Sequence, residues 1–317
     1  MPKPHYCNSE LFNIDLTGKN YIITGANSGI GFTTAKQLSK QGAHIILACR
    51  RVNAGEEAVR QIQHDIPQAS VEVMALDLGD LSSVRRFVAG FQSTHEQLHG
   101  LINNAGIMNT PKTLTEDGFE SQIGVNHLGH FLLSHLLLDM LKSTPLARII
   151  NVSSCLHVQA MGREARIDFE DLHFGNRKYN GWDAYAQSKL ANVLHAKKLA
   201  QLVEGTDVTA VSLHPGWVRT NLAKHSMPLW FQNFILRPIK GFIGLIEPWE
   251  GSQTTLHCIL DPDVVNHNGA FFSQSGGYRE KSQNAGGWPM RSPNQHAHDV
   301  ALVDRFWDVS LNLVGES

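Results

Sequence analysis

The stretch Lys19-Asn-Tyr-Ile-Ile-Thr24, followed by Gly25-Ala-Asn-Ser-Gly29-Ile-Gly31 and a helical pattern from Phe32 to Gln41, decides the fold. An apolar strand, a glycine-rich turn and a helix in this order predict a mononucleotide-binding unit. The glycines let the backbone approach a pyrophosphate, and the helix N-terminus offers N–H donors and a positive dipole. The spacing is GxxxGxG rather than GxGxxG, so a turn that caps the helix for purely structural reasons is the alternative.

A second apolar strand, His44 to Cys49, ends at Arg50-Arg51. A site for NAD normally has Asp or Glu about 20 residues beyond the glycines, where it binds the ribose 2′-hydroxyl. Here Arg50 stands 19 positions after Gly31. Because a forked, charged guanidinium suits a 2′-phosphate, we expect NADP(H) rather than NAD(H), with two solvated arginines as the alternative.

The rest of the chain alternates strands and helices, with no internal repeat and no Ser/Gly-rich linker. The further strands are expected at Val71–Leu78, Leu101–Gly106, Arg148–Ser154, from Val208 to the Pro215-Gly216 turn, and at Gly269–Phe272. This order predicts an α/β fold, a single Rossmann-type doubly wound parallel sheet with helices on both faces and a C-terminal extension. We expect one domain, residues 1–317, with a cofactor-binding half (about 15–150) and a catalytic and substrate-binding half (about 151–317).

Polar side chains stand where two of these strands end, at the edge of the sheet where open α/β folds bind ligands. Asp77 could accept from an adenine amino group, or it could cap the helix that begins near Leu81. Ser153 and Ser154 end a later strand, and we expect them to face the same crevice as the glycine turn.

The segment Gly124 to Leu141 is predicted as one long, almost wholly apolar helix that is buried on several sides or lies in a subunit interface. Asn126 near its start is a polar group that needs buried partners. His127, His130 and His135 are expected to pack or to be solvated rather than to bind a metal.

The stretch Asp183-Ala-Tyr-Ala-Gln-Ser-Lys-Leu-Ala191 is compatible with a helix. Tyr185 and Lys189 are four positions apart, so the phenol and the ammonium point to the same side of that helix. A nearby cation favours the phenolate and lowers the tyrosine pKa from about 10, which makes proton transfer near neutral pH feasible. Taken alone, the pair could equally be an ordinary helix face.

Composition excludes several classes of function. The formal net charge of -2 provides no basic surface for nucleic acid. The 4 cysteines have no CxxC spacing, and the 17 histidines form no metal-binding motif, so we expect a reducing compartment and no bound metal. No secretory signal is expected at the start of the chain, and we expect a cytoplasmic protein.

Two segments of the second half have no assigned role in the sheet. Residues 229–246 are apolar and aromatic, but too short and interrupted for a transmembrane segment. They could form a lid over a substrate pocket or rest on a membrane as a peripheral contact, and the lid is preferred because the segment follows the Pro215-Gly216 turn. Residues 275–298 are expected to form a long loop that is functional or mobile.

Several motifs, taken together, resemble the classical short-chain dehydrogenase/reductase family over essentially the whole chain. They are Thr24-Gly-Ala-Asn-Ser-Gly-Ile-Gly31, Asn103-Asn-Ala-Gly106, Asn126, Ser154, the Tyr185/Lys189 pair and Pro215-Gly216. The retinol dehydrogenase branch is most similar, through Leu47-Ala-Cys-Arg50, Asp117-Gly-Phe-Glu120, Val125-Asn-His-Leu-Gly-His-Phe-Leu-Leu133, Ser188-Lys-Leu-Ala-Asn192 and His214-Pro-Gly216.

The resemblance implies a role for each matching residue. Tyr185 would be the general acid/base, and Lys189 would lower its pKa and hydrogen-bond the nicotinamide ribose. Ser154 would hold the substrate carbonyl oxygen, with Ser153 as the weaker candidate, and Asn126 would anchor a water that links Lys189 to solvent. The expected cofactor-binding residues are Gly25, Asn27, Ser28, Gly29, Ile30, Gly31, Arg50, Asp77, Leu78, Asn104, Ala105, Gly106, Tyr185, Lys189, Pro215, Gly216, Val218 and Thr220.

The resemblance therefore implies an NADP-dependent alcohol dehydrogenase or carbonyl reductase for a small lipophilic substrate such as a retinoid, a steroid or an aliphatic aldehyde. A homodimer could form through Gly124–Leu141 and Ala184–Leu202, unless the C-terminal part blocks one of these helices. Membrane-bound retinol dehydrogenases often carry an N-terminal apolar anchor, and we expect none here.

Two other functions are alternatives. A non-catalytic NADP-binding regulator would use the same nucleotide site for sensing. Light-dependent protochlorophyllide reductases are also similar, through Ala48-Cys-Arg50, Leu76-Asp-Leu-Gly79 and Asn126-His-Leu-Gly129, but Ser154 argues against that assignment.

Overall fold

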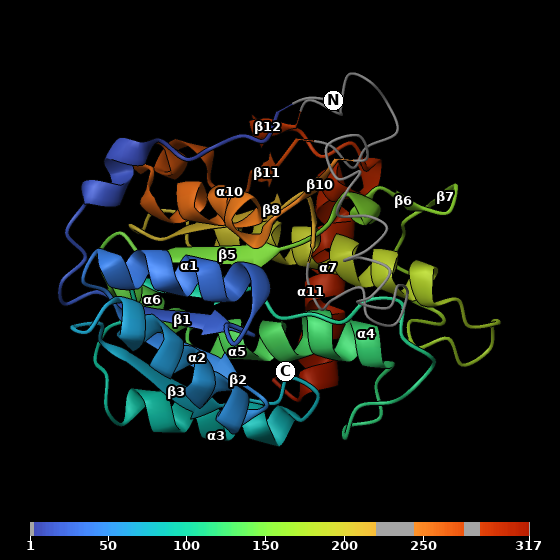
Figure 1. Cartoon of the computed structure of the whole chain (residues 1–317). Coiled ribbons are helices and arrows are strands. Elements are labelled where there is room, and N and C mark those ends of the chain that lie inside the picture. The colour runs from blue at the N-terminus through green and yellow to red at the C-terminus, as the bar shows by residue number, and fades with distance from the viewer. Residues whose placement is uncertain (1–2, 220–243, 276–285, 317) are drawn as a thin grey trace, which may run out of the picture.

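The computed structural model describes residues 3–219, 244–275 and 286–316. Within these ranges, eight strands form one sheet in the order β12-β11-β8-β5-β4-β1-β2-β3 (Figure 1). Its strands are β1 (Asn20–Thr24), β2 (His44–Cys49), β3 (Val71–Ala75), β4 (Gly100–Asn103), β5 (Arg148–Val152), β8 (Thr209–His214), β11 (Phe271–Ser273) and β12 (Gly287–Met290). Neighbouring strands pair in parallel, except β11 and β12, which are antiparallel.

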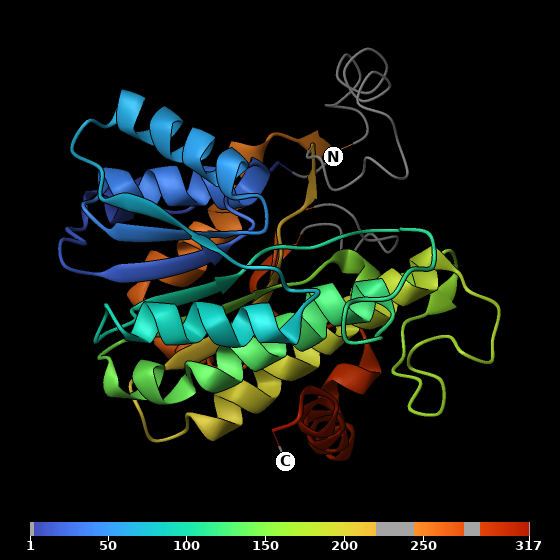
Figure 2. The same cartoon turned by 90° about the horizontal axis from the view of Figure 1, so that it is seen from below.

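Helices cover both faces of this sheet, as Figure 2 shows. One layer contains α1 (Gly29–Lys40), α2 (Val52–Asp65) and α10 (Pro248–Leu260), and the other contains α3 (Leu81–Gln92), α5 (Gly129–Leu136) and α7 (Gly181–Leu202). Alternation along β1 separates the two cores, because Ile23 packs in the first and Ile22 in the second. The predicted doubly wound α/β fold is confirmed.

Shorter elements connect this framework. They are η1 (Ser9–Asn13), α4 (Ser121–Ile123), η2 (Gly124–Leu128), α6 (Leu138–Ser143), η3 (Cys155–His157), β6 (Gln159–Ala160), β7 (Arg163–Glu164), β9 (Trp217–Val218), β10 (Leu245–Ile246), η6 (Pro262–His267), η7 (Gln295–His298) and the long α11 (Val300–Val314). In the described ranges, no helix has the length and apolar character needed to cross a membrane.

The predicted continuous helix from Gly124 to Leu141 is wrong. The chain instead forms α4, the π-helical turn η2, α5 and α6 in succession. The wide turn is centred on Asn126, whose side chain binds groups outside the helix, and π turns of this kind often mark functional sites. Periodicity cannot show this interruption, because the partners of Asn126 lie elsewhere in the sequence.

Several strand boundaries also differ from the predictions, and one of them bears on the site. The strand that contains Val71 ends at Ala75 rather than Leu78, and the N-cap of α3 is Asp80, which accepts from the backbone N–H groups of Ser82 and Ser83. The capping role considered for Asp77 is therefore wrong. Its carboxylate accepts instead from the Gly79 N–H at 2.9 Å.

The predicted loop from 275 to 298 is also wrong in part, because β12 lies inside it and extends the sheet beyond β11. A strand of four residues that contains Pro289 has little apolar alternation by which to recognise it. Residues 276–285 of that loop lie outside the described ranges. So do Thr220 and most of the apolar stretch 229–246, and the structure gives no placement for the predicted lid.

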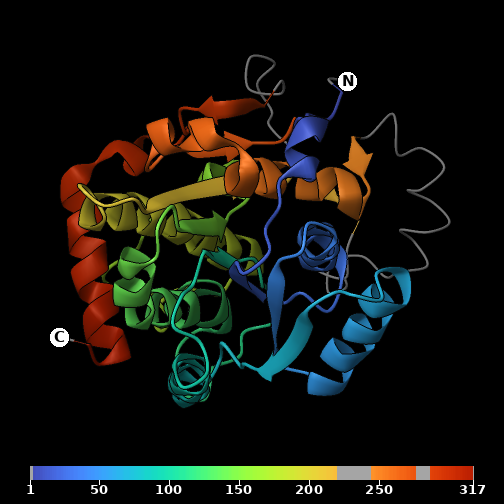
Figure 3. The ribbon, with the colours of Figure 1, turned by 90° about the vertical axis from the view of Figure 1, so that its left-hand side faces the viewer.

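The last helix, α11, packs against α7 and α5, as Figure 3 shows. Trp307 of α11 stacks near Phe131 of α5, with ring centroids 4.6 Å apart, and lies 6.0 Å from the ring of His195 on α7. Phe306 stacks on His127 at 4.8 Å. Around Phe306 and Trp307, α11 therefore covers the apolar faces of α5 and α7 that were considered for a homodimer.

Candidate active site

The glycine turn between β1 and α1 approaches the end of β4 so closely that side chains would not fit. Gly25 and Gly29 have φ values of 66° and 60°, which favour glycine. A Cβ atom on Gly25 would lie 3.0 Å from the Ala105 Cα, and one on Gly31 would lie 2.6 Å from the Asn104 Nδ2. The turn therefore exposes backbone beside the start of a helix, the geometry that binds a pyrophosphate.

Thr24 joins this turn to the end of β4. Its Oγ1 accepts from the backbone N–H groups of Asn104 and Ala105, both at 2.9 Å. The same oxygen lies 2.8 Å from Nε2 of His130, whose Nδ1 lies 3.0 Å from the carbonyl oxygen of Asn126. Since a carbonyl only accepts, Nδ1 has the proton, and the Thr24 hydroxyl donates to Nε2. Burial lowers the pKa of His130 to about 4, which is consistent with a neutral ring.

The side chain of Asn126 makes three buried hydrogen bonds. Its Oδ1 accepts from the Ile107 N–H at 2.8 Å, and its Nδ2 donates to the Ile107 carbonyl and to Ser188 Oγ, both at 2.9 Å. Ser188 Oγ in turn donates to the Tyr185 carbonyl at 2.8 Å. Asn126 therefore fixes the segment after β4 to the first half of α7, and the water-anchoring role expected for it stays a prediction.

The N-terminal part of α7 places Tyr185 and Lys189 beside the end of β5. Asn180 caps the helix by accepting from the N–H groups of Trp182 and Asp183. Lys189 Nζ donates to the Val152 carbonyl at 2.9 Å and lies 5.7 Å from the Tyr185 ring centroid. The predicted sharing of one helix face is thus seen in the structure.

The structure pairs Tyr185 with Ser154 rather than with Ser153. Burial raises the pKa of Tyr185, and a hydrogen bond with the Ser154 side chain offsets part of that rise. Ser154 Oγ also accepts from the Leu156 N–H at 3.2 Å. Ser153 Oγ instead donates to the Lys189 carbonyl at 2.7 Å and is turned towards the backbone of α7. Ser154 is therefore the serine placed to share a ligand with Tyr185.

Burial dominates the ionisation of this pair. It raises the pKa of Tyr185 above its ordinary value and lowers the pKa of Lys189 to about 7. The net shift of Tyr185 is therefore opposite to the direction expected from a neighbouring ammonium. The reason is desolvation, because a buried phenol loses the water that would stabilise its phenolate.

Other predicted cofactor residues within the described ranges border the same end of the sheet. Arg50 follows β2 and is exposed, while Leu78 and Pro215 are buried. Gly216 has a φ of 91°, and a Cβ atom there would meet Ile246 at 2.7 Å. The site of a Cβ on Gly251 lies 2.5 Å from a methyl of Val218 and 3.3 Å from Ile30, so the Pro215-Gly216 turn reaches the glycine turn by way of α10.

Sequence reasoning assigned no role to Thr24, His130 or Ser188, although the structure uses all three to connect the predicted residues. Their positions in the sequence, next to predicted site residues, could have indicated these three residues. Thr24 ends a strand directly before the glycines, His130 lies one helical turn after Asn126, and Ser188 directly precedes Lys189. A buried polar residue requires partners, and these were the nearest polar candidates.

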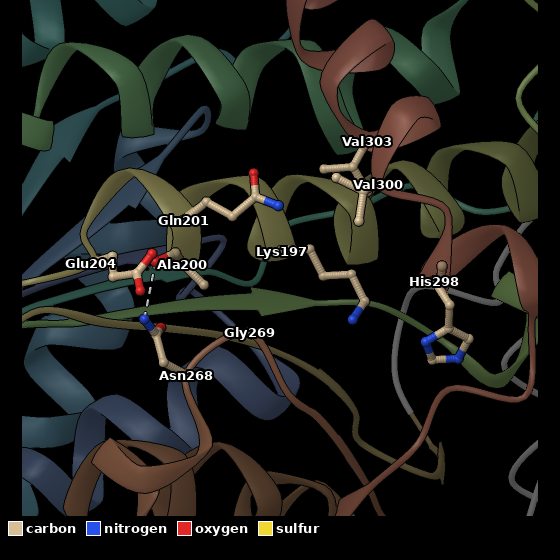
Figure 4. Close-up of a pocket in the computed structure, with 10 residues that line it drawn as sticks. Lys197, Ala200, Gln201, Glu204, Asn268, Gly269, His298, Val300 and Val303 are labelled. Atoms are coloured by element: carbon tan, nitrogen blue, oxygen red, sulfur yellow. Dashed lines mark hydrogen bonds between the residues drawn. The ribbon is translucent and has the colours of Figure 1, made fainter.

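A separate concave surface lies away from these residues. One pocket of about 430 Å³ lies between the C-terminal half of α7 and the start of α11, lined by residues that include Lys197, Gln201 and Val303 (Figure 4). Asn268 there donates to the Ala200 carbonyl at 3.1 Å. None of the predicted catalytic residues lines this pocket, and its open, polar character favours a solvated surface groove.

A doubly wound sheet with a glycine turn at its switch point defines the Rossmann-type class of nucleotide-binding folds. The sequence model described as short chain dehydrogenase matches residues 19–165. Retinol dehydrogenase 12 of Bos taurus is 43% identical over 303 residues, covering 96% of this chain and 88% of the relative. Retinol dehydrogenase 11 of Homo sapiens is 41% identical over 306 residues, covering 95% and 87%.

Structural comparison agrees. A crystal structure of an uncharacterized protein from Mycobacterium paratuberculosis superposes with a TM-score of 0.73 at 35% identity, covering 95% of each chain. The chain therefore belongs to the short-chain dehydrogenase family of oxidoreductases and resembles its retinol dehydrogenases. Members of this family bind a nicotinamide dinucleotide.

Proposed function

We propose that this protein is an NADP(H)-dependent oxidoreductase that interconverts an alcohol and a carbonyl on a lipophilic substrate. The observation that carries the proposal is the placement of Ser154, Tyr185 and Lys189 together after β5, with Lys189 Nζ 3.5 Å from the position of a Cβ on Gly106. Each of these side chains is buried, and buried groups with strongly shifted pKa values gather at sites where protons are transferred.

The residues around the glycine turn fit a dinucleotide. Positions 25 and 31 have no room for a side chain, and Ser28, the N-cap of α1, makes no side-chain capping bond, which leaves the first N–H groups of that helix available to a phosphate. Gly25 to Gly31 would hold the pyrophosphate, Lys189 the nicotinamide ribose, and Val218 the carboxamide side. The bound cofactor supplies or accepts the hydride.

The proton chemistry belongs to the side chains of the protein. In the reducing direction Tyr185 would donate its phenolic proton to the oxygen of the substrate, and Ser154 would be the second donor to that oxygen. Lys189 is held by the Val152 carbonyl, and Asn126 holds the neighbouring backbone in place. A carbonyl oxygen that becomes an alkoxide is thus met by two preorganised hydroxyl groups.

The preference for NADP(H) rests on Arg50. Its guanidinium follows β2 and is exposed at the position where NAD-dependent folds place a carboxylate. A 2′-phosphate would find a positive charge there, and a 2′-hydroxyl would find no acceptor from this side chain. Equilibrium titration with NADPH and NADH measures the preference directly, and equal affinities would contradict it.

The lipophilic substrate is supported by two independent facts. The relatives named above are called retinol dehydrogenases, and retinol is an apolar alcohol. The sequence from 229 to 246, which follows the Pro215-Gly216 turn, is rich in Trp, Phe, Ile and Leu. An NADPH-oxidation screen over aldehydes and ketones of graded chain length and ring content tests this class, and turnover of small polar carbonyls only would refute it.

The Tyr185→Phe variant tests the chemistry. It removes one hydroxyl and little volume, so we expect NADPH affinity to stay within a few-fold while turnover is lost, because no other described group replaces the phenolic proton. A Tyr179→Phe variant is the matched control, since that tyrosine lies in the insert before α7. Unchanged turnover in Tyr185→Phe would remove it from the reaction. NADPH binding with no turnover by the unmodified protein would favour the regulator instead.

A further inference from the structure

We propose that His44, Glu72 and His95 form a binding site for one divalent transition-metal ion, with Zn²⁺ as the expected ion. His44 is the first residue of β2, Glu72 is the second residue of β3, and His95 follows α3. These positions lie at the N-terminal ends of the strands, whereas the glycine turn and Tyr185 lie at the C-terminal ends. The site is therefore separate from the candidate active site.

Strand register brings the three side chains together. Ile45 pairs with Val71 and Ile46 with Glu72, so the side chain of Glu72 emerges on the same face as that of His44, two residues before Ile46. This is the face that α3 covers, and the chain that leaves α3 places His95 above it. Two adjacent strands and the end of one helix thus supply one ligand each.

The spacing of the ligand atoms suits a small ion. His44 Nε2 lies 3.4 Å and His95 Nε2 lies 3.7 Å from the same oxygen, Glu72 Oε1. All three ligand atoms lie within 4.8 Å of one another. In a tetrahedral zinc site with bonds of about 2.0–2.1 Å, neighbouring ligand atoms are about 3.3 Å apart. The two separations from Glu72 Oε1 are therefore close to those between ligand atoms of a tetrahedral site, and a cation would draw the three atoms into three of its four positions.

The second nitrogen of each imidazole is already held, as is usual for metal-ligating histidines. His44 Nδ1 lies 2.7 Å from Ser70 Oγ. His95 Nδ1 lies 2.8 Å from Thr94 Oγ1 and 3.3 Å from the carbonyl oxygen of Phe91. Because that carbonyl only accepts, the contact favours a proton on Nδ1 and directs Nε2 of His95 towards the Glu72 carboxylate. A cation placed between Nε2 and this carboxylate would be bound by both.

The rings are also fixed by stacking. His95 stacks on Phe91 with centroids 4.4 Å apart and an interplanar angle of 8°, and the ring of His44 lies 5.3 Å from that of His95 at an angle of 20°. Side-chain exposures of 25% for His44, 44% for Glu72 and 14% for His95 leave the ligand atoms within reach of solvent ions. The site is thus both preorganised and accessible.

Two imidazoles and one carboxylate form the ligand set that zinc takes in several protein sites, with the fourth position left to water. Here the ion would connect β3, the edge strand of the sheet, to β2 and to the end of α3. Such an ion would stabilise the folded state, because it binds ligands that the unfolded chain does not bring together. We expect it to leave the turnover of the enzyme unchanged.

The test uses the full chain, freed of metal with a chelator and titrated with Zn²⁺ against a chromogenic competitor. We expect one ion per chain, a higher melting temperature with Zn²⁺, and visible absorption by the Co²⁺ form that is typical of a nitrogen and oxygen ligand set. Glu72→Gln and His95→Ala should each lower the affinity at least about tenfold. His64→Ala, a histidine on α2 whose side chain is 87% exposed, is the matched control.

Binding that is absent in the unmodified protein, or equal in the two ligand variants and in the control, would overturn the proposal. Glu72→Gln keeps the size of the side chain, so it distinguishes lost coordination from a folding defect. The Co²⁺ spectrum is measured on the unmodified protein and reports the ligands without any substitution.

Discussion

At the scale of one residue, the burial of Lys189 lowers the stability of the folded chain. Its amine is buried, donates to the Val152 carbonyl, and has its pKa lowered to about 7 by desolvation. A cation placed in this way destabilises the folded chain, because water solvates it better than one carbonyl does. The residue is therefore explained by its predicted part in the reaction and in binding the ribose, and not by the packing of α7.

A Lys189→Met variant should therefore be more stable and inactive. The Val152 carbonyl keeps a partner, since Asn192 Nδ2 donates to it at 3.1 Å. We expect the free energy of unfolding at neutral pH to rise by about 1–4 kcal/mol. Urea unfolding measures the gain, with Lys198→Met on the same helix as the control, since Lys198 pairs with Asp304 near the surface. A less stable variant would contradict this account.

The pH dependence of that gain has a defined sign. The unfolded chain keeps the proton on Lys189 up to an ordinary pKa of 10.5, while the folded chain releases it near 7. Between these values the unfolded state binds more protons, so the stability of the unmodified protein rises with pH. The advantage of Lys189→Met should be largest near pH 7 and shrink towards about pH 10.

At the scale of elements, the π-helical turn η2 connects the nucleotide side of the site to the catalytic side. His130 bridges Thr24 at the end of β1 and the carbonyl of Asn126, and Asn126 in turn bonds Ile107 and Ser188. The sequence placed Asn126 in a helix and predicted that it needs partners, but it could not predict the turn. Its cause is a set of hydrogen bonds between residues far apart in the chain.

Replacing His130 tests this connection. His130→Leu removes the buried hydrogen bonds that the ring makes with the Thr24 hydroxyl and the Asn126 carbonyl, so we expect about 1–3 kcal/mol of lost stability. Turnover should also fall, by about ten- to a hundredfold, because Asn126 and α7 shift relative to the glycine turn. His127→Leu is the matched control. It loses a contact with Ser310 and should lower stability alone. Equal kinetics in both variants would assign His130 a purely structural role.

At the scale of the whole molecule, local patterns predicted seven of the eight strands of the sheet, including the edge strand β3, but not β12 at the other edge. Several inner strands are apolar runs that are followed directly by Gly, Asn or Ser, as β1 is by Gly25, β4 by Asn104 and β5 by Ser153, and β2 begins and ends at the predicted residues. The antiparallel strand β12 was missed because its four residues have no clear alternation. The functional residues also divide into those that the sequence indicates and those that only the fold brings together. Tyr185, Lys189 and Ser154 stood out by type and spacing, whereas the cluster of His44, Glu72 and His95 depends on register alone.

The packing of α11 gives a prediction at this scale. Trp307→Ala removes a ring that contacts Phe131, His135 and His195, and large aromatic truncations in cores cost about 3–5 kcal/mol. We expect a corresponding loss in urea unfolding, and self-association of the variant in size-exclusion chromatography if the exposed faces of α5 and α7 meet. Asp304→Ala on the same helix removes only a surface ion pair and should change stability by about 0–1 kcal/mol.

The position of α11 in the chain has a consequence for biosynthesis. Every element that it covers is translated before it, so an aromatic stripe that includes Phe131 and His195 stays uncovered until residues 300–314 leave the ribosome. Chaperones that hold apolar segments would find a binding surface on the nascent protein during this interval. A chain that ends before this helix would keep the aromatic stripe exposed. We expect proteolysis to remove such a product even though its nucleotide-binding half is complete.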